Sequence, residues 1–397
     1  MMRVAYVCAD PGVPVLGNKG CSIHVQEMVR AFVKYPLQVD LFAASLGGYQ
    51  SAGLENINLH TLPKTTSSDK ADREQKALEA NKYLYEILKK TGPFDMVYER
   101  YSLWSHAGME YANDHAIPGM LEVNAPLIDE QVKHRELYDR ASAEMVKKKA
   151  FGNATALLAV SDEVACSLRK SDSDSFNHIH VVPNGIDPKR FPENLTPSME
   201  KSDSVFRVCF VGTLKPWHGL PNLIDAFEKV YARNNSAQLW IIGDGPQKEK
   251  LVKSISLKKL NEAVYFTGAV KSDRIPGLLA SMDAAVAPYP LLKDFYFSPL
   301  KVYEYMAAGL PVVASGIGQL KILISNNVNG LLCAPGDINQ LAEAILLLHD
   351  DVKLRTKLGA EARRSVINKF TWNNVVETIM RIATDKNRRL TGVRKAV

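Results

Sequence analysis

Short apolar runs alternate with longer amphipathic stretches through the first half of the chain. Apolar runs of strand length lie at residues 4–9, 39–44, 57–62, 96–98, 120–123, 156–160 and 180–182. The stretches between them predict helices at residues 22–34, 70–90, 103–115, 129–149 and 161–170. Ser161 is a residue type that caps helix N-termini. This alternation is typical of βαβ units and predicts a parallel sheet.

The same alternation begins again after a break in the middle of the chain. Pro183, Asn184 and Gly185 interrupt the first series, and a polar stretch at residues 193–204 follows as a linker. The second series has strand-like runs at residues 206–211, 239–242, 264–266, 284–287, 311–314 and 331–333. Helices are expected at residues 339–349 and 352–368, and a last helix begins at Trp372.

These patterns predict an α/β fold with two Rossmann-like, doubly wound domains. The first spans residues 1–183, the second spans residues 184–370, and a C-terminal helix at residues 371–397 packs back on the first. The length of 397 residues agrees, because hydrophobic cores tend to split above roughly 250–300 residues. Open parallel sheets bind ligands at the carboxyl ends of their strands, so we expect the two domains to face one interdomain cleft.

Composition narrows the cellular setting. Hydrophobic residues make up 46% of the chain and charged residues 23%, which is typical of a globular protein. The five cysteines show no C-x-x-C spacing, which indicates buried thiols in a reducing compartment. The N-terminal apolar run ends too early for a signal peptide, and no run reaches the ~20 apolar residues that span a bilayer. The prediction is a cytoplasmic protein.

The net charge of +6 is concentrated in part at the C-terminus. The basic residues there are Lys386, Arg388, Arg389, Arg394 and Lys395. They form either a solvated tail or a weak peripheral contact with the inner face of the membrane. Nucleic acid is not expected as a partner, because no basic stripe is interleaved with aromatic residues.

The sharpest motif reads F-S-P-L-K-V-Y-E-Y-M-A-A-G and lies late in the second half. Ser298 as N-cap, Pro299 at the first helical position and Gly309 at the end predict a short helix. Lys301 places a cation in the first turn, where the helix dipole opposes it unless an anion binds there. A phosphate would remove this conflict. The alternative is an i,i+3 salt bridge between Lys301 and Glu304.

Together with the residues that follow it, this segment resembles the donor-site signature of the retaining glycosyltransferase family four, and the resemblance runs over nearly the whole chain. It implies the GT-B fold and a UDP-sugar donor, with Lys301 on the pyrophosphate and Glu304 on the ribose. Tyr296 stands where the family carries a glutamate near the donor sugar. The donor-binding residues expected beside them are Phe297, Ser298 and Leu300.

A turn after the first strand of the second half resembles the family's phosphate-binding turn. Its candidates are Gly212, Thr213, Lys215 and His218, and the family usually carries Arg in place of Thr213 and Lys in place of His218. We expect Lys215 to supply the missing cation. We also expect His218 to donate a hydrogen bond to a diphosphate oxygen without carrying a full charge.

Other turns complete the predicted donor site. Gly243, Asp244 and Gly245 end another strand, and the resemblance places this turn beside the nucleoside. It also makes Val270 a candidate contact to uracil. In the first half, Gly20 lies at a helix start, where backbone N–H groups can hold a phosphate.

Polar residues that end two strands of the first half predict the acceptor side. Glu99 and Arg100 end one strand, Glu122 and Asn124 another, and Glu130 lies in the following helix. Asn124 stands where many family members carry a histidine, and it can hydrogen-bond a sugar hydroxyl. Glu99, Arg100 and Glu130 are the acceptor-side candidates, with a structural Glu99–Arg100 pair as the alternative.

The resemblance implies a retaining hexosyltransferase that uses neither a metal nor a cofactor, with the departing diphosphate taking the acceptor's proton. The predicted catalytic residues are Lys215, Lys301, Asn124 and Glu122. UDP-glucose is the expected donor, and the acceptor is a polysaccharide, a lipid-linked sugar or a small molecule. Asp172 and Asp174 are weak metal candidates. The alternatives are a nucleotide-sugar epimerase and a non-catalytic, UDP-sugar-binding regulatory partner.

Overall fold

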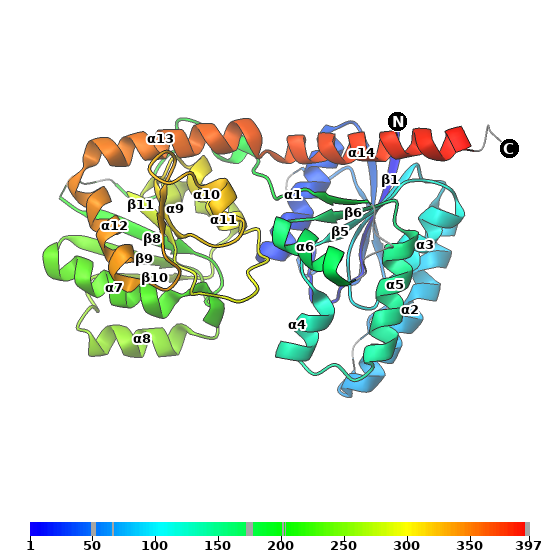
Figure 1. Cartoon of the computed structure of the whole chain (residues 1–397), viewed down its shortest axis with the longest axis horizontal. Helices are drawn as coiled ribbons and strands as arrows, with labels where there is room; N and C mark the ends of the chain where they lie inside the picture. Colours follow the sequence, from blue (N-terminus) through cyan, green and yellow to red (C-terminus); the bar gives the residue numbers. More distant parts are fainter. Residues whose placement is uncertain (49–52, 66, 172–177, 201, 203, 394–397) are drawn as a thin grey trace. The chain divides into compact units, whose positions relative to one another are not determined.

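The computed structural model describes residues 1–48, 53–65, 67–171, 178–200, 202 and 204–393 (Figure 1). The chain forms two compact units. Unit 1 holds Met1–Asn184 together with the chain from Trp372 onward, and unit 2 holds Gly185–Thr371. The weak metal candidates at positions 172 and 174 lie outside the described residues, as do the side chains of the basic tail.

Unit 1 is built on a parallel sheet with the strand order β3-β2-β1-β4-β5-β6-β7. The strands are β1 (Arg3–Cys8), β2 (Gln38–Ala43), β3 (Asn58–Thr61), β4 (Met96–Arg100), β5 (Gly119–Val123), β6 (Ala156–Ala159) and β7 (Ile179–Val181). Each lies within two residues of a predicted strand. The central strands β1, β4 and β5 are almost wholly buried on both faces, which is why they are continuous apolar runs in the sequence.

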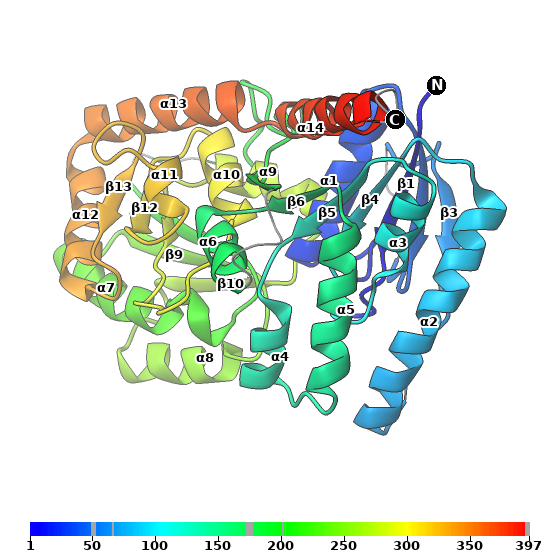
Figure 2. The same ribbon diagram turned by 45° about the vertical axis from the view of Figure 1, so that its right-hand side comes forward.

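Helices cover both faces of this sheet. They are α1 (Gly20–Lys34), α2 (Lys70–Thr91), α3 (Ala107–Asp114), α4 (Leu127–His134), α5 (Arg140–Asn153), α6 (Asp162–Ser171) and α14 (Trp372–Val393). α2, α3 and α5 pack side by side, whereas α1 packs against α14 (Figures 1 and 2). Ser161 caps α6 as predicted, because its Oγ accepts the Val164 N–H at 3.2 Å.

The single helix predicted at residues 129–149 is wrong. The structure has two helices there, α4 and α5, separated by a turn. Asp139 begins α5 by accepting the Ser142 N–H at 2.9 Å, and Glu74 of α2 accepts the N–H groups of Tyr138 and Asp139 at 3.2 and 2.9 Å. These acceptors satisfy backbone donors that a continuous helix would have bonded internally.

Unit 2 contains a second parallel sheet, in the order β10-β9-β8-β11-β12-β13. The strands are β8 (Phe206–Val211), β9 (Ala237–Ile242), β10 (Val264–Gly268), β11 (Ala284–Ala287), β12 (Val312–Ser315) and β13 (Leu331–Cys333). The helices are α7 (Leu220–Arg233), α8 (Lys248–Leu257), α9 (Ile275–Ala280), α10 (Leu300–Ala307), α11 (Leu320–Leu323), α12 (Ile338–Asp350) and α13 (Val352–Lys369), and three short 3₁₀ turns are η1 (Pro188–Arg190), η2 (Pro216–His218) and η3 (Ser272–Arg274).

Alternation along β8 shows how this sheet divides its core. Val208 and Phe210 join one buried cluster, which packs under α7, α8 and α12. Cys209 and Val211 join the other, which packs under α9 and α10 and part of α13. Successive side chains of a strand point to opposite faces, so both faces are covered. The predicted α/β class, with two doubly wound parallel sheets, is confirmed.

Candidate functional site

Two loops at the carboxyl ends of β8 and β9 lie backbone against backbone. The Gly212 N–H donates to the Ile242 carbonyl at 2.9 Å, and the Leu214 N–H donates to the Asp244 carbonyl at 3.0 Å. A Cβ atom at Gly243 would lie 2.1 Å from the Gly212 carbonyl oxygen, and Gly243 has φ +143°. Only glycine fits such a contact. The two turns therefore form one rigid rim at this edge of the sheet.

The helix α10 begins one residue later than the sequence predicts. Pro299, in an extended conformation, is the N-cap, and Leu300 is the first helical residue. Ser298 does not cap the helix, because its Oγ lies 3.3 Å from the Tyr303 hydroxyl instead. Gly309 follows the last turn with φ +74°, so the predicted helix end is confirmed.

Lys301, in the first turn of α10, carries a buried ammonium group. Its Nζ lies 3.9 Å from the centroid of the Phe210 ring and 5.7 Å from that of Tyr289, and it has no hydrogen-bond partner among the described residues. A Cβ atom at Gly212 would lie 3.0 Å from Nζ, so the ammonium rests against the glycine backbone. Burial lowers the Lys301 pKa to about 7.

His218 of η2 completes the group that we call the Lys301 site (Phe210, Gly212, His218, Tyr289 and Lys301). Its ring centroid lies 5.7 Å from that of Tyr289 and 5.8 Å from that of Phe210. Burial, reinforced by the nearby charge of Lys301, lowers the His218 pKa to about 3. The neutral ring is therefore the stable form near neutral pH.

The hydrogen bond of His218 corrects one expectation. His218 Nδ1 lies 2.6 Å from the Thr213 carbonyl oxygen, which can only accept. The proton of the neutral ring is therefore on Nδ1, and Nε2 carries a lone pair. For Nε2 to donate to a phosphate oxygen, the ring would have to gain a second proton and a positive charge.

The remaining predicted donor residues of these two turns are Thr213, Lys215 and Asp244. Lys215 is half-buried, with Nζ 5.6 Å from the Trp217 ring centroid, and Thr213 beside it is exposed. Asp244 accepts the Gly245 N–H at 2.7 Å and lies 3.4 Å from Lys248 Nζ.

Aromatic packing joins the segment before α10 to the Lys301 site. The Phe297 ring is nearly parallel to the Tyr289 ring, with centroids 6.5 Å apart. The centroids of the Tyr296 and Phe297 rings are 4.6 Å apart. The sequence pointed to Tyr296 and Phe297 but not to Phe210 or Tyr289. Phe210 is an ordinary apolar position of β8, and Tyr289 lies just after β11.

Glu304 is held by an arginine that sequence reasoning missed. Arg190 NH1 lies 3.2 Å from Glu304 Oε1, and Arg190 NH2 donates to the Ser272 carbonyl at 2.8 Å. The predicted alternative, a Lys301–Glu304 salt bridge, is not formed. Ser272 lies two residues after Val270, which packs against the core of unit 2. Arg190 thus joins the segments that carry Glu304 and Val270.

In unit 1, Glu122 is the centre of the Glu122 cluster (His24, Tyr98, Arg100, Glu122 and Asn124). Glu122 Oε2 accepts from the Tyr98 hydroxyl and lies 2.7 Å from His24 Nε2. Oε1 accepts from Arg100 NH1 at 2.7 Å and from the Asn124 amide. Burial alone would raise the Glu122 pKa, but His24, Arg100 and Tyr98 outweigh it and hold the pKa well below its usual range.

The predicted alternative of a Glu99–Arg100 pair is wrong, because Arg100 pairs with Glu122. Glu99 lies on the other side of β4, fully buried, and accepts from the Ser105 hydroxyl at 2.5 Å. Burial raises its pKa to about 7. Adjacent residues of a strand point to opposite faces, which explains why the two side chains do not meet.

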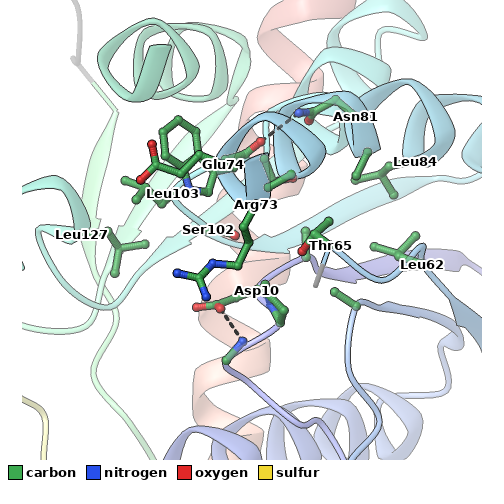
Figure 3. A pocket seen from close by; sticks show the side chains of 18 of the residues that line it. Asp10, Leu62, Thr65, Arg73, Glu74, Asn81, Leu84, Ser102, Leu103 and Leu127 are labelled. Carbon is green, nitrogen blue, oxygen red and sulfur yellow. Dashed lines mark hydrogen bonds between the residues drawn. The ribbon is translucent and has the colours of Figure 1, made fainter. Parts of the chain in front are cut away.

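Two further candidates of unit 1, Gly20 and Glu130, lie in the first turns of helices. Gly20 is the first residue of α1, where no side chain caps the helix. Glu130 of α4 is among the residues that line a pocket of about 470 Å³ at the carboxyl edge of the sheet. Figure 3 shows this pocket with Asp10, Arg73 and Leu127 on its walls. Sequence reasoning did not predict this pocket, because segments distant in the sequence line it.

Comparison with known proteins identifies the family. A Glycosyltransferase Family 4 domain matches residues 19–190, and a Glycosyl transferases group 1 domain matches residues 205–351. The chain belongs to this glycosyltransferase family. The two matched ranges together contain all of the predicted donor and acceptor residues, among them Lys301, Glu304 and Glu122.

Relatives in this family share part or all of the chain. An uncharacterised glycosyltransferase of Methanocaldococcus jannaschii is 29% identical over 228 residues, which cover 55% of this chain and 56% of that protein. A second from the same organism is 23% identical over 373 residues, covering 93% and 95%. The chain spans about half the length of several curated relatives that it matches.

Solved structures confirm the GT-B fold. Anabaena HepE, solved in complex with UDP and glucose, has a TM-score of 0.72 at 18% identity, with 97% of this chain and 100% of HepE covered. Among the residues that the structure describes, no helix combines the length and apolar character needed to traverse a lipid bilayer.

Proposed function

We propose that the chain is a retaining glycosyltransferase that transfers glucose from UDP-glucose to a polysaccharide, lipid-linked or small-molecule acceptor. The supporting observation is the Lys301 ammonium, which is buried at the start of α10 without a described hydrogen-bond partner. A buried charge without a partner is unfavourable, and an anion in contact with it would offset that cost. The N-terminus of α10 favours the same anion.

A diphosphate is the anion that best suits this position. Gly212 carries no side chain, so its backbone lies directly against the Lys301 ammonium and adds no bulk beside it. Lys215, in the same loop, adds a second positive charge at the rim. Related solved structures support a nucleotide donor, because HepE was solved with UDP and glucose and also with UDP-glucose.

The reaction would proceed by charge stabilisation of the leaving group. The bond between the anomeric carbon and the diphosphate oxygen breaks, and the acceptor oxygen bonds to the same face of that carbon. UDP leaves with the electron pair and takes the acceptor's proton. Lys301, Lys215 and the start of α10 stabilise its negative charge, so this scheme uses no metal ion.

His218 would respond to the same charge. Its Nε2 carries a lone pair in the uncharged ring, and a diphosphate beside it would favour the protonated ring. Donor binding would then draw a proton onto His218 while its Nδ1–H stays on the Thr213 carbonyl. A histidine could in this way replace the lysine that the family usually carries at this position.

Glu304 would accept hydrogen bonds from the ribose hydroxyls, and Val270 would contact the base. Arg190 holds the Glu304 side chain and the chain after Val270 at once, so it would act as a positioning residue for the nucleoside. On the acceptor side, Glu122, both of whose oxygens are hydrogen-bonded, would position Arg100 and Asn124. Asn124 would hydrogen-bond a sugar hydroxyl.

The test is the Lys301→Ala variant, assayed for UDP release from UDP-glucose and for UDP affinity by calorimetry. Removal of a preorganised cation should lower kcat by about 10²–10³. Lys253→Ala, which removes an exposed lysine of α8 in the same unit, is the matched control and should retain wild-type rates.

Three results would contradict parts of this proposal. A Lys301→Ala variant with wild-type turnover would remove the diphosphate assignment. An isomeric nucleotide sugar, formed from UDP-glucose alone, would favour an epimerase. Tight UDP-glucose binding without hydrolysis or transfer to any acceptor would favour a regulatory protein.

A further inference from the structure

Trp372, the first residue of α14, packs against the Glu122 cluster of unit 1. The residue is 3% exposed, and its ring meets the His24 ring edge to face, with centroids 5.1 Å apart and an interplanar angle of 86°. Aromatic rings attract each other in this arrangement, so the contact favours one orientation of each ring. α14 also packs along α1, which carries His24 (Figures 1 and 2). The His24 ring is therefore supported from the side of α14.

The His24 ring also contacts Glu122, which lies 98 residues away in the sequence. Nε2 lies 2.7 Å from Glu122 Oε2, and both side chains are at most 5% exposed. The pKa of Glu122 is held well below its usual range, so the carboxylate accepts and the ring proton is on Nε2. A hydrogen bond weakens steeply as its donor turns out of line. The orientation of the His24 ring therefore decides the strength of this bond.

Glu122 transmits this orientation to two residues at the carboxyl edge of the sheet. Oε2 accepts from His24 and Tyr98. Oε1 accepts from Arg100 NH1 at 2.7 Å and from the Asn124 amide. A carboxylate is planar, so two donors on Oε2 also determine where Oε1 lies. Arg100 ends β4 and Asn124 follows β5, and these are the strand ends at which open parallel sheets bind ligands.

From these contacts we infer that Trp372 and His24 are positioning residues for the reaction. Trp372 orients the His24 ring, and the ring holds the Glu122 carboxylate. The carboxylate in turn sets the directions of the Arg100 and Asn124 side chains. That Arg100 and Asn124 serve an acceptor sugar rests on the proposed glucosyl transfer.

A role of Trp372 in packing alone makes different demands on its side chain. If Trp372 only packed α14 on unit 1, any large apolar residue would serve at this position. An aromatic ring of defined orientation is needed only if the direction of the His24 imidazole matters. The two roles therefore differ in what Trp372→Leu and Trp372→Phe should do.

The orientation of His24 is measured by NMR on the full chain labelled with nitrogen-15 histidine. Burial protects the Nε2 proton from exchange with water, so the hydrogen bond to Glu122 should give a downfield imidazole N–H resonance. His24→Gln identifies this resonance by its loss. Trp372→Leu retains apolar volume without a ring and should broaden or remove the resonance. Trp372→Phe retains a ring that can meet His24 edge to face and should restore it.

Turnover is measured as UDP release from UDP-glucose, with water alone and with maltose as the acceptor probe. Trp372→Leu should lower kcat by about ten-fold to a hundred-fold, because a small misplacement of groups beside the reacting atoms is costly. The KM for UDP-glucose and the affinity for UDP should stay the same, because the Lys301 site belongs to unit 2. Trp372→Phe should recover most of kcat.

Ile379→Ala is the matched control for lost packing. Ile379 is a fully buried residue of the same helix, and its truncation leaves a cavity that should lower the melting temperature. The His24 resonance and the kcat of the folded protein should keep their wild-type values in this variant. The control separates a loss of stability from a loss of orientation.

The inference fails if Trp372→Leu behaves like Ile379→Ala, with a lower melting temperature but a wild-type resonance and kcat. It also fails if the wild-type chain shows no protected imidazole resonance that His24→Gln removes, or if Trp372→Leu loses the resonance and retains kcat. If the resonance depends on the Trp372 ring but the wild-type chain never turns over UDP-glucose, the orientation of the Glu122 cluster by Trp372 stands and the proposed transfer fails.

Discussion

Two buried charged groups, one in each unit, show opposite solutions to the same physical problem. In the Glu122 cluster, four donors surround one carboxylate, and both oxygens are hydrogen-bonded. In the Lys301 site, the ammonium contacts aromatic rings and a glycine backbone but no described acceptor. A buried charge whose hydrogen bonds are all made within the protein stabilises the fold, whereas a buried charge without such partners is suited to binding a ligand. We therefore assign a positioning role to the Glu122 cluster and a ligand-binding role to the Lys301 site.

The largest expected effect comes from breaking the Glu122 cluster. Glu122→Ala leaves the Arg100 guanidinium buried without its carboxylate, and it should lower the free energy of unfolding of unit 1 by about 3–5 kcal/mol. Urea denaturation followed by circular dichroism measures this change. Asn124→Ala, which removes one donor and leaves the charge pair intact, should cost less. An equal loss in both variants would show that the charge pair is not what stabilises the cluster.

Removing the charge of Lys301, unlike that of Glu122, is not expected to lower the stability of the fold. Lys301→Met replaces an unpaired buried cation by an apolar side chain of similar length, so thermal stability without ligand should stay the same or rise. Turnover should fall by about 10²–10³ in the same protein. A drop in melting temperature comparable to that of Glu122→Ala would erase the contrast between the two units.

The pH dependence of donor affinity should carry the signature of Lys301. Its pKa is about 7 without ligand, and a bound diphosphate would raise it. Above pH 7 the neutral amine must gain a proton to bind, so UDP-glucose affinity should fall by up to about ten-fold per pH unit between pH 7 and 9. Calorimetry across this range measures the slope. Lys301→Met should remove the part of the slope that begins near pH 7, whereas His218→Gln should retain that part and lose only the proton uptake that donor binding is proposed to induce at His218.

The smallest effect is expected at Arg190. Arg190→Lys retains a positive charge but cannot reach both Glu304 and the Ser272 carbonyl in the same geometry. The KM for UDP-glucose should rise by roughly three- to ten-fold with little change in kcat, as for the loss of one ordinary hydrogen bond. Arg207→Lys, at another half-buried arginine of unit 2, is the control. If the variant loses kcat and retains KM, Arg190 does not position the nucleoside.

Regular secondary structure was predictable because its signals are local. The strands of both sheets lie within two residues of the apolar runs, and the caps at Ser161 and Gly309 were identified from residue type. The failures also have local explanations. An aspartate cap at position 139 divides one expected helix into two, and Pro299 takes the cap position predicted for Ser298.

The candidate site was predictable only in part. Lys301 was noticeable from the sequence, because a cation in a first turn contradicts the helix dipole. Its aromatic surroundings were not, since Phe210 and Tyr289 come from a different strand and loop. Arg190 lies between the break at residues 183–185 and the polar linker at residues 193–204, and nothing in that segment indicates a partner 82 residues away at Ser272.

The sequence by itself determined the order of strands and helices, the division into two α/β series, the family resemblance and the anomaly at Lys301. Each of these depends on periodicity, residue type or spacing within a few turns of chain. The tertiary structure alone decided which charges are satisfied and where space remains. His24 meets Glu122 across 98 residues, and α2 and α4 enclose a pocket with strand-end loops. Burial and pairing are properties of three-dimensional packing, so no local pattern encodes them.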